Sequence, residues 1–348
     1  MKKSIVALVL LILLLATGCS HKTNDQVIEQ QLYVFGTVVS LSFYGIDNEK
    51  AAAAGDEINK MFRQMHNDWH AWQKGALTDI NDAIASGKPI QVHDSLIPLI
   101  EKSQEAARLS DNLFNPAIGK LIRLWGFQSS EMPTGPIPSE EEIAKLVAEH
   151  PTMADVEIKD GVFTSKNRAV QMDFGGVAKG YAVELALKRL QEMGVHNAIV
   201  NAGGGLGVIG QHGDRPWRVG IQNPFGEGAL GSLEVRDGEN VHTSGNYERY
   251  REWQGKRYSH IIDPRTGWPV QEVVSATVIY TDGALTDAFT KPFIVGGTKE
   301  WYDFAKRLHL KDVMVVDTQG TVYMTPEMQK RVHFETKPVK VVVSPPID

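Results

Sequence analysis

Hydrophobic and polar residues alternate along several short stretches of the chain, and a period of two predicts β-strands. The clearest strands follow this pattern in "YVFGTVVSLSFY", "NAIVNAG", "LGVIG", "WRVGIQ" and "SATVIYTD", and "VMVVDTQGTVYMTP" predicts a hairpin. Apolar positions at helical spacing predict helices over residues 51–72, 95–110 and 284–297. Strands and helices are mixed without strict alternation, which favours an α+β fold.

The N-terminus has the pattern of a bacterial lipoprotein signal. Lys2 and Lys3 precede the apolar run "IVALVLLILLL", and "ATGCS" follows with small residues and a cysteine. The apolar run is short for a membrane span, although an uncleaved membrane anchor is the alternative. We therefore expect a signal peptide at 1–18, a lipid on the Cys19 sulfur, a polar tether at 19–30 and a folded domain at 31–348.

Composition excludes several classes of function. Cys19 is the only cysteine, so a disulfide, a thiolate nucleophile and a zinc–thiolate site are not expected. The chain has 36 Lys and Arg against 42 Asp and Glu, a formal charge of −6, and removal of two lysines with the signal gives 34 − 42 = −8. No clustered basic surface is apparent, so nucleic acid is not an expected partner.

A glycine-rich turn lies between a short apolar run and a helical pattern in "QMDFGGVAKGYAVELALKRLQEMGV", residues 171–195. Its glycines fit the outer positions of a Walker loop, but Tyr181 stands where the phosphate-binding lysine is required, and Val177 breaks a dinucleotide fingerprint. The turn could still offer backbone N–H groups to an anion, with Asp173 and Lys179 flanking it. An ordinary strand-to-helix turn is the alternative.

The segment 241–270 carries more polar chemistry than a surface requires, and it ends in "HIIDPRTG". In an extended chain His260 and Ile262 share a face, so a ring-shaped ligand could rest on Ile262 and be polarised by His260. The alternative is a hairpin that turns at "DPRTG", with His260 a half-buried histidine of the sheet.

Three further segments contain candidate ligand-binding groups. In "ALTDAFTKP", helical spacing places Asp287, Thr290 and Lys291 on one face, where a carboxylate and a hydroxyl could meet a cation; an exposed Asp–Lys pair is the alternative. Trp72 ends a predicted helix, where its indole could stack on a flat ligand or pack in the core. "LFNPAIGKLIRLWGF" places Asn115 among apolar residues.

Taken together, these motifs resemble the FAD:protein FMN transferases, the ApbE-like lipoproteins. The resemblance rests on "FGTVVS", "LFNPAIGKLIRLWGF", "DFGGVAKGYA", "TSGNYERY", "HIIDPRTG" and "TDAFT", which occur in the family's order over nearly the whole mature chain. It implies one domain of two closely packed α/β lobes with the FAD site between them. It also implies a magnesium-dependent enzyme that splits FAD, releases AMP and attaches FMN to a Ser or Thr of a target flavoprotein.

The resemblance also assigns residues. It implies that FAD is surrounded by Phe35, Trp72, Leu113, Phe114, Asn115, Asp173, Lys179, His260 and Ile262. It implies that Mg²⁺ is held by the backbone carbonyl of Gly176 and by the helix that carries Asp287 and Thr290. Oxygen ligands suit Mg²⁺, and a divalent cation relieves the repulsion between a diphosphate and an attacking oxygen. His260 is the best candidate for proton acceptor by its chemistry, with Asp173 or no dedicated base as alternatives.

Two positions depart from the family's pattern. Lys291 stands where the family has a Thr, and an ammonium cannot ligate Mg²⁺. Either Thr290 or water takes that place, or Lys291 contacts a phosphate oxygen directly. Asn115 stands where many relatives have Asp. Both changes make the site more positive toward a diphosphate.

Two other functions remain open on the sequence. A FAD pyrophosphatase would use the same site with water as nucleophile, and a lipid-anchored flavin carrier would bind FAD without reaction. The expected partners are FAD, a target flavoprotein such as a membrane-bound electron-transfer subunit, and the membrane through the lipid. The expected location is the cell envelope, facing the periplasm if the cell is Gram-negative, and Ser20 after the cysteine favours the outer membrane over the inner one.

Overall fold

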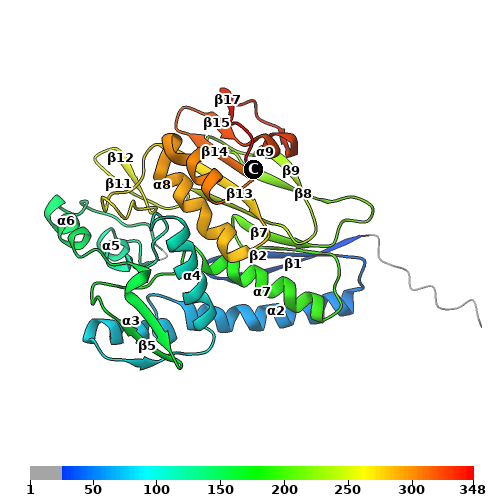
Figure 1. Ribbon diagram of the computed structural model, residues 1–348. Coiled ribbons are helices and arrows are strands. Elements are labelled where there is room, and N and C mark those ends of the chain that lie inside the picture. The colour runs from blue at the N-terminus through cyan, green and yellow to red at the C-terminus, as the bar shows by residue number, and fades with distance from the viewer. Residues whose placement is uncertain (1–25, 130) are drawn as a thin grey trace, which may run out of the picture.

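A computed structural model of the protein describes residues 26–129 and 131–348 (Figure 1). The predicted signal peptide and Cys19 lie outside these residues. The first strand, β1 (Val27–Val34), begins within the segment 19–30 that was predicted as a tether. The folded domain therefore starts at least four residues before the predicted boundary, because Val27 to Gln30 already pair with β2.

A nine-stranded sheet forms the centre of the molecule (Figure 1). Neighbouring strands are antiparallel except for β15 and β17, which are parallel. Its strands in spatial order are β1, β2 (Thr37–Tyr44), β6 (Ala198–Asn201), β7 (Gly205–Ile209), β10 (Asn240–Gly245), β13 (Val273–Tyr280), β14 (Asp312–Asp317), β15 (Thr321–Met324) and β17 (Lys340–Val343).

Three helices cover one face of this sheet: α2 (Asn48–Trp69), α7 (Ala178–Glu192) and α8 (Gly283–Arg307). α8 lies against β10 and β13 and packs along α7, which in turn contacts β7 and α2. Apolar residues of the sheet and helices form the main core, and it includes Phe43, Phe62 and Phe293. The predicted helix 284–297 is longer than expected, since α8 continues to Arg307 beyond a break at Gly297.

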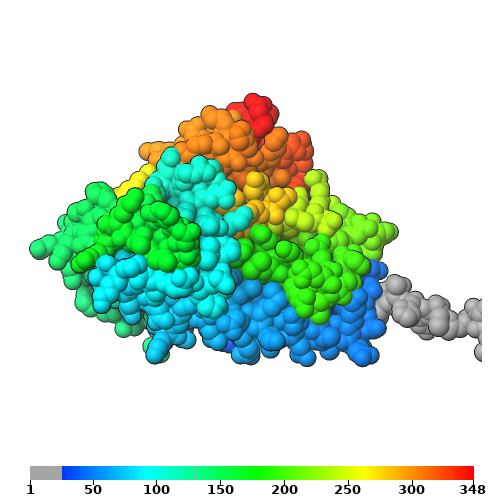
Figure 2. All heavy atoms as spheres, turned by 60° about the horizontal axis from the view of Figure 1, so that its bottom comes forward, coloured from blue at the N-terminus to red at the C-terminus, as the bar shows by residue number. Residues whose placement is uncertain are grey.

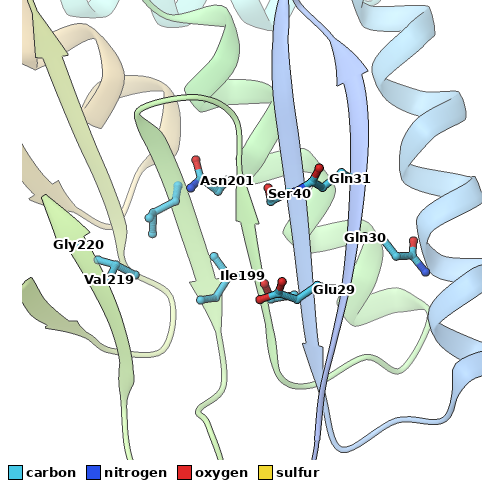
Figure 3. A pocket seen from close by; sticks show the side chains of 10 residues that line it. Glu29, Gln30, Gln31, Ser40, Ile199, Asn201, Val219 and Gly220 are labelled. Carbon is cyan, nitrogen blue, oxygen red and sulfur yellow. The ribbon is translucent and has the colours of Figure 1, made fainter. Parts of the chain in front are cut away.

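The opposite face of the sheet is covered in part by a small sheet of β8 (Trp217–Gln222), β9 (Ala229–Val235) and β16 (Val332–Phe334). The short α9 (Pro326–Arg331) comes directly before β16 in the chain and lies beside β14. A second apolar cluster fills the space between the two sheets. Beside it, the outer face of β1, β2 and β6 carries a hollow of about 280 Å³. Its lining is largely polar and includes Glu29, Gln31, Ser40 and Asn201 (Figure 3).

A second lobe lies at the end of the helical layer. It contains α3 (Ala76–Ser86), α4 (Ile97–Leu109), α5 (Gly119–Leu124), α6 (Glu140–Ala148), a 3-10 turn η1 (Met153–Asp155), a sheet of β3 (Ile90–Gln91), β5 (Val162–Ser165) and β4 (Val156–Lys159), and the hairpin β11 (Tyr250–Trp253) and β12 (Lys256–Ser259). A capping box of Ser139 and Glu142 starts α6.

The two lobes are closely packed. Buried residues of α3 and α4, such as Leu77 and Leu99, belong to the same core cluster as the strands of the large sheet. In the space-filling view the cyan and green segments of the second lobe form a continuous surface with the blue and orange helices (Figure 2). The α+β fold is confirmed. In the described part of the chain, no helix combines the length and apolar character needed to cross a membrane.

Candidate functional site

Asp173 joins two of the sequence-predicted segments. Its backbone is held beside the segment 114–117, because the Asp173 N–H donates to the Pro116 carbonyl at 2.9 Å. Its buried carboxylate accepts a hydrogen bond from Trp72 Nε1 at 3.1 Å and another from the Gly175 N–H at 2.8 Å. Trp72 lies three residues beyond the end of α2, so this bond fixes a loop aromatic against the glycine-rich turn.

Two cations face this carboxylate. Burial raises the pKa of Asp173, while its hydrogen bonds and the charges of Arg249 and Lys179 oppose that rise. The Arg249 guanidinium lies 6.0 Å from the centroid of the Trp72 ring, near enough for a cation–π contact. Within the described residues the Lys179 ammonium has neither an ion-pair nor a hydrogen-bond partner.

His260 is positioned by the backbone of Arg249. Its N–H and its Nδ1 lie 2.9 and 3.1 Å from the Arg249 carbonyl oxygen, at the end of β12. A carbonyl only accepts, so Nδ1 carries the proton and Nε2 is the acceptor nitrogen of the ring. Burial lowers the pKa of His260 to about 4, and the cations Arg249, Lys179 and Lys291 act in the same direction. The ring is therefore neutral at pH 7, as a proton acceptor must be.

Asp287 lies at the crossing of α7 and α8, where two glycines face each other. A Cβ on Gly180 would stand 2.2 Å from the Gly283 carbonyl oxygen and 2.6 Å from Asp287 Cβ. This closeness lets Asp287 Oδ2 accept the Gly180 N–H at 3.1 Å, in the first turn of α7. The carboxylate is 4% exposed and thus caps the neighbouring helix from within the protein.

Lys291 occupies the other side of this carboxylate. Its ammonium lies 2.5 Å from Asp287 Oδ1 and 2.8 Å from the Asp287 carbonyl oxygen. The buried His242 ring adds a nitrogen, Nδ1, 3.8 Å from Oδ1. Burial alone would raise the pKa of Asp287, but the charge of Lys291, with smaller contributions from His242 and Lys179, outweighs it and holds the pKa below its usual range.

The residues around Asp287 do not fit a resident divalent ion. Mg²⁺ ligated to Oδ1 at about 2.1 Å would stand at most 2.5 Å + about 2.1 Å = about 4.6 Å from the Lys291 ammonium. At an effective dielectric constant of about 20, the repulsion is about 7 kcal/mol. The described residues also include no group of three or more His, Cys, Asp or Glu side chains able to hold a metal.

Thr290, the third predicted metal ligand, is fully buried. Its hydroxyl donates to the Asp287 carbonyl at 2.7 Å and lies 2.7 Å from the Ser244 hydroxyl of β10. The structure thus gives Thr290 two partners inside the protein, one on its own helix and one on the sheet. Metal ligation by Gly176, Asp287 and Thr290 stays a prediction that this arrangement does not favour.

The other predicted FAD contacts divide into two groups. Phe35 forms the two-residue turn between β1 and β2 with φ of 57°, and its ring packs on Phe62 and His66. Ring contacts continue from His66 through His70 to Trp72, so Phe35 lies in one aromatic row with Trp72. This row is a surface on which a planar ligand could stack.

Leu113, Phe114, Asn115 and Ile262 lie deeper. The first two belong to the main core, and Ile262 packs in a third cluster with Trp125 and others. The Asn115 side chain is used by the backbone, since Nδ2 donates to the Pro151 carbonyl at 2.9 Å and Oδ1 accepts from the Ala117 N–H at 3.0 Å. The Asn115 amide therefore fixes the conformation of its own loop and holds it against the segment at Pro151.

Three residues near the site were not predicted from the sequence: Arg249, His242 and Glu248. Arg249 faces Asp173 and Trp72. His242 lies beside Asp287, and its buried Nε2 has no partner among the described residues. The Glu248 carboxylate lies within the field of Lys179 and Lys291. The sequence "TSGNYERY" did contain two of these charges, but nothing in it showed which way they point. The hollow on β1, β2 and β6 is lined by other residues, and so is a second hollow beside α4.

Comparisons with known proteins agree with this assembly. A family model described as the ApbE family matches residues 35–315. An FAD:protein FMN transferase of Rhodobacter capsulatus is 41% identical over 304 residues, which cover 87% of this chain and 58% of that protein. One from Escherichia coli (strain K12) is 29% identical over 315 residues, covering 88% of each. The chain thus spans less than two thirds of the first relative and most of the second.

A solved structure extends the likeness to three dimensions. The crystal structure of the ApbE protein from Thermotoga maritima superposes with a TM-score of 0.80 at 28% identity. The superposition covers 90% of this chain and 100% of the other. The nine-stranded sheet, its helices and the second lobe therefore correspond to a fold already seen in a crystal.

Proposed function

The chain belongs to the ApbE family, and we propose that it transfers FMN from FAD to a Ser or Thr hydroxyl of a target flavoprotein, with release of AMP. Relatives that carry the name FAD:protein FMN transferase support this activity. The observation that carries the proposal is the convergence of Trp72, Asp173, Lys179, Arg249 and His260 from four separate segments of the chain.

These residues supply what a dinucleotide with a diphosphate requires. The aromatic row that ends at Trp72 offers a stacking surface. Lys179 and Arg249 offer positive charge for the phosphates, and Arg donates in a planar fork that matches phosphate oxygens. A basic nitrogen, His260 Nε2, lies in the field of the same cations. Binding and chemistry would therefore take place in one site at the junction of the two lobes.

The transfer is a displacement at phosphorus. The target hydroxyl oxygen forms a bond to the phosphorus of the FMN half, and the bond from that phosphorus to the bridging oxygen breaks. The electron pair of the broken bond leaves with AMP. The hydroxyl proton passes to His260 Nε2, with Asp173 or water as the alternative acceptor, and then to solvent.

The magnesium that the resemblance implies is a separate part of the proposal. Mg²⁺ bound to a diphosphate neutralises charge and stabilises the leaving phosphate. Because the residues around Asp287 do not fit a resident ion, we assign no step of the transfer to it. Lipid attachment at Cys19 and a place in the cell envelope are also proposals, and they rest on the N-terminal sequence.

The test is an incubation of the full chain with FAD and a candidate acceptor subunit, followed by measurement of AMP and of protein-bound flavin fluorescence in a denaturing gel. Transfer requires both AMP and covalent flavin, and both must be lost when the acceptor Ser or Thr is replaced by Ala. AMP with free FMN would instead identify a FAD pyrophosphatase. Binding of FAD without AMP would identify a carrier.

A further inference from the structure

Lys291 stands between the two groups that the family resemblance assigns to a metal. Its Nζ contacts Asp287 Oδ1, and it lies 3.6 Å from the point where a Cβ on Gly176 would stand. Lys291 Cε is 3.0 Å from that same point, so the lysine stem runs along the glycine-rich turn. The side chain of Lys291 is 16% exposed and that of Asp287 is 5% exposed, so the pair is largely withdrawn from water.

We propose that the Lys291 ammonium takes the position of a divalent cation beside Asp287, so that the chain binds the diphosphate of FAD without a resident metal ion. This inference rests on the proposed function for the identity of its ligand. It concerns which cation stands at that position in this chain.

The hydrogen-bond count of the ammonium supports this role. An ammonium has three N–H donors and no acceptor. Two of the donors are directed to the Asp287 carboxylate and carbonyl. The third remains for a phosphate oxygen, and lysine binds phosphate as a point charge.

The charge count explains the surrounding cations. A lysine paired with one carboxylate is neutral, whereas Mg²⁺ paired with one carboxylate keeps one positive charge. The remaining positive charge must come from elsewhere in this site. Lys179, in the first turn of α7, supplies it, because no carboxylate of the described residues pairs with it directly. The field of Lys179 reaches both Asp287 and His260.

The first arm of the test measures metal binding without FAD. The full chain is treated with EDTA, dialysed and titrated with Mn²⁺ as a spectroscopic substitute for Mg²⁺, with free Mn²⁺ followed by electron paramagnetic resonance. We expect no stoichiometric Mn²⁺ site in the wild-type chain and one site in Lys291→Thr. A stoichiometric wild-type site that is lost in Asp287→Asn would overturn the proposal.

The second arm measures FAD binding by quenching of flavin fluorescence, in EDTA and in excess Mg²⁺. The wild-type affinity should change less than about threefold between the two conditions. In EDTA, Lys291→Thr should bind roughly tenfold to a hundredfold more weakly, the effect of one lost charge-assisted hydrogen bond, and Mg²⁺ should restore its binding. Wild-type binding that appears only with Mg²⁺ would contradict the proposal.

Controls separate this inference from folding and from the transferase function. Lys291→Met gives a second variant without the ammonium and without a new hydroxyl, and it should weaken FAD binding with no rescue by Mg²⁺. Lys299→Thr changes an exposed lysine of the same helix and should behave as wild type. If the wild-type chain binds FAD in EDTA but never releases AMP, the proposed function fails while the inference stands.

Discussion

Replacing Gly180 with alanine is expected to move α8 away from α7 and to impair both stability and transfer. The added Cβ would stand 2.2 Å from the Gly283 carbonyl oxygen, where ordinary contacts begin at 3.4 Å. The difference, 3.4 − 2.2 = 1.2 Å, must be accommodated by backbone, because both obstructing groups belong to the helix-crossing itself.

The magnitude follows from two opposing effects. Overpacking a close contact costs about 1–3 kcal/mol, and replacing a helical glycine by alanine returns about 1 kcal/mol. A net loss of up to about 2 kcal/mol in the free energy of unfolding is therefore expected. The effect on transfer should be larger, because a displacement of about 1 Å in a catalytic site can lower a rate about a hundredfold, and Asp287 and Lys291 move with α8.

The control is the same substitution in another helix. A Cβ on Gly55 of α2 would meet only the amide end of Gln30, with Oε1 at 1.7 Å, and a flexible side chain can turn away. Gly55→Ala should therefore be neutral or slightly stabilising. Urea unfolding and FAD-dependent AMP release measure both variants. If Gly180→Ala matches Gly55→Ala in stability and rate, the close crossing does not set the geometry of the site.

Four further predictions concern single side chains. His260→Asn should lower the rate of transfer about a hundredfold with little loss of FAD affinity. Because burial lowers the pKa of His260 to about 4 and the neutral ring is the active form, the wild-type rate should stay level as the pH falls through about 6.5 and drop only near 4. A pH–rate profile of the wild-type chain checks this. Trp72→Ala should weaken FAD binding by about 1–3 kcal/mol in a fluorescence titration, and unchanged affinity would remove Trp72 from the site. Asn115→Ala should cost about 1–3 kcal/mol of stability in urea unfolding and leave FAD affinity nearly unchanged, because both ends of its amide bond the backbone. Cys19→Ser should leave an unprocessed or soluble protein on membrane fractionation, whereas a wild-type chain found in the cytosol would contradict the lipoprotein signal.

Periodicity alone predicted the fold where each element has one buried face. The alternation in 37–44 marks β2, whose buried positions are Val39, Leu41 and Phe43. Periodicity could not place the beginning of β1. The exposed face of β1 is polar, and without knowledge of its partner strand such a polar segment resembles a tether. Pairing with β2 over the whole length of β1 is what gives those polar residues a fixed structure.

The sequence singled out candidate residues by the chemistry of their side chains, but it could not show their direction. Asp173 and His260 were candidates of this kind, and the structure places both beside Arg249. The amide of Asn115 could serve either a ligand or a loop, and the sequence does not show that Pro151 lies within 2.9 Å of it. Arg249 was missed for the converse reason: its role depends on the hairpin β11–β12, which returns His260 to its carbonyl.

Asp287 shows why the metal question needs Lys291 variants. On the sequence it could be an exposed helix carboxylate, whose removal costs little stability. In the structure it is buried, it caps α7 through the Gly180 N–H and it pairs with Lys291. Removing one partner of a buried pair costs about 3–5 kcal/mol, so Asp287→Ala would lower activity through the fold whether or not a metal binds. Lys291→Thr also breaks this pair, so its stability is measured together with its activity, but it preserves the Asp287 carboxylate and its bond to Gly180. Excess Mg²⁺ can then restore the missing positive charge, which it cannot do in Asp287→Ala.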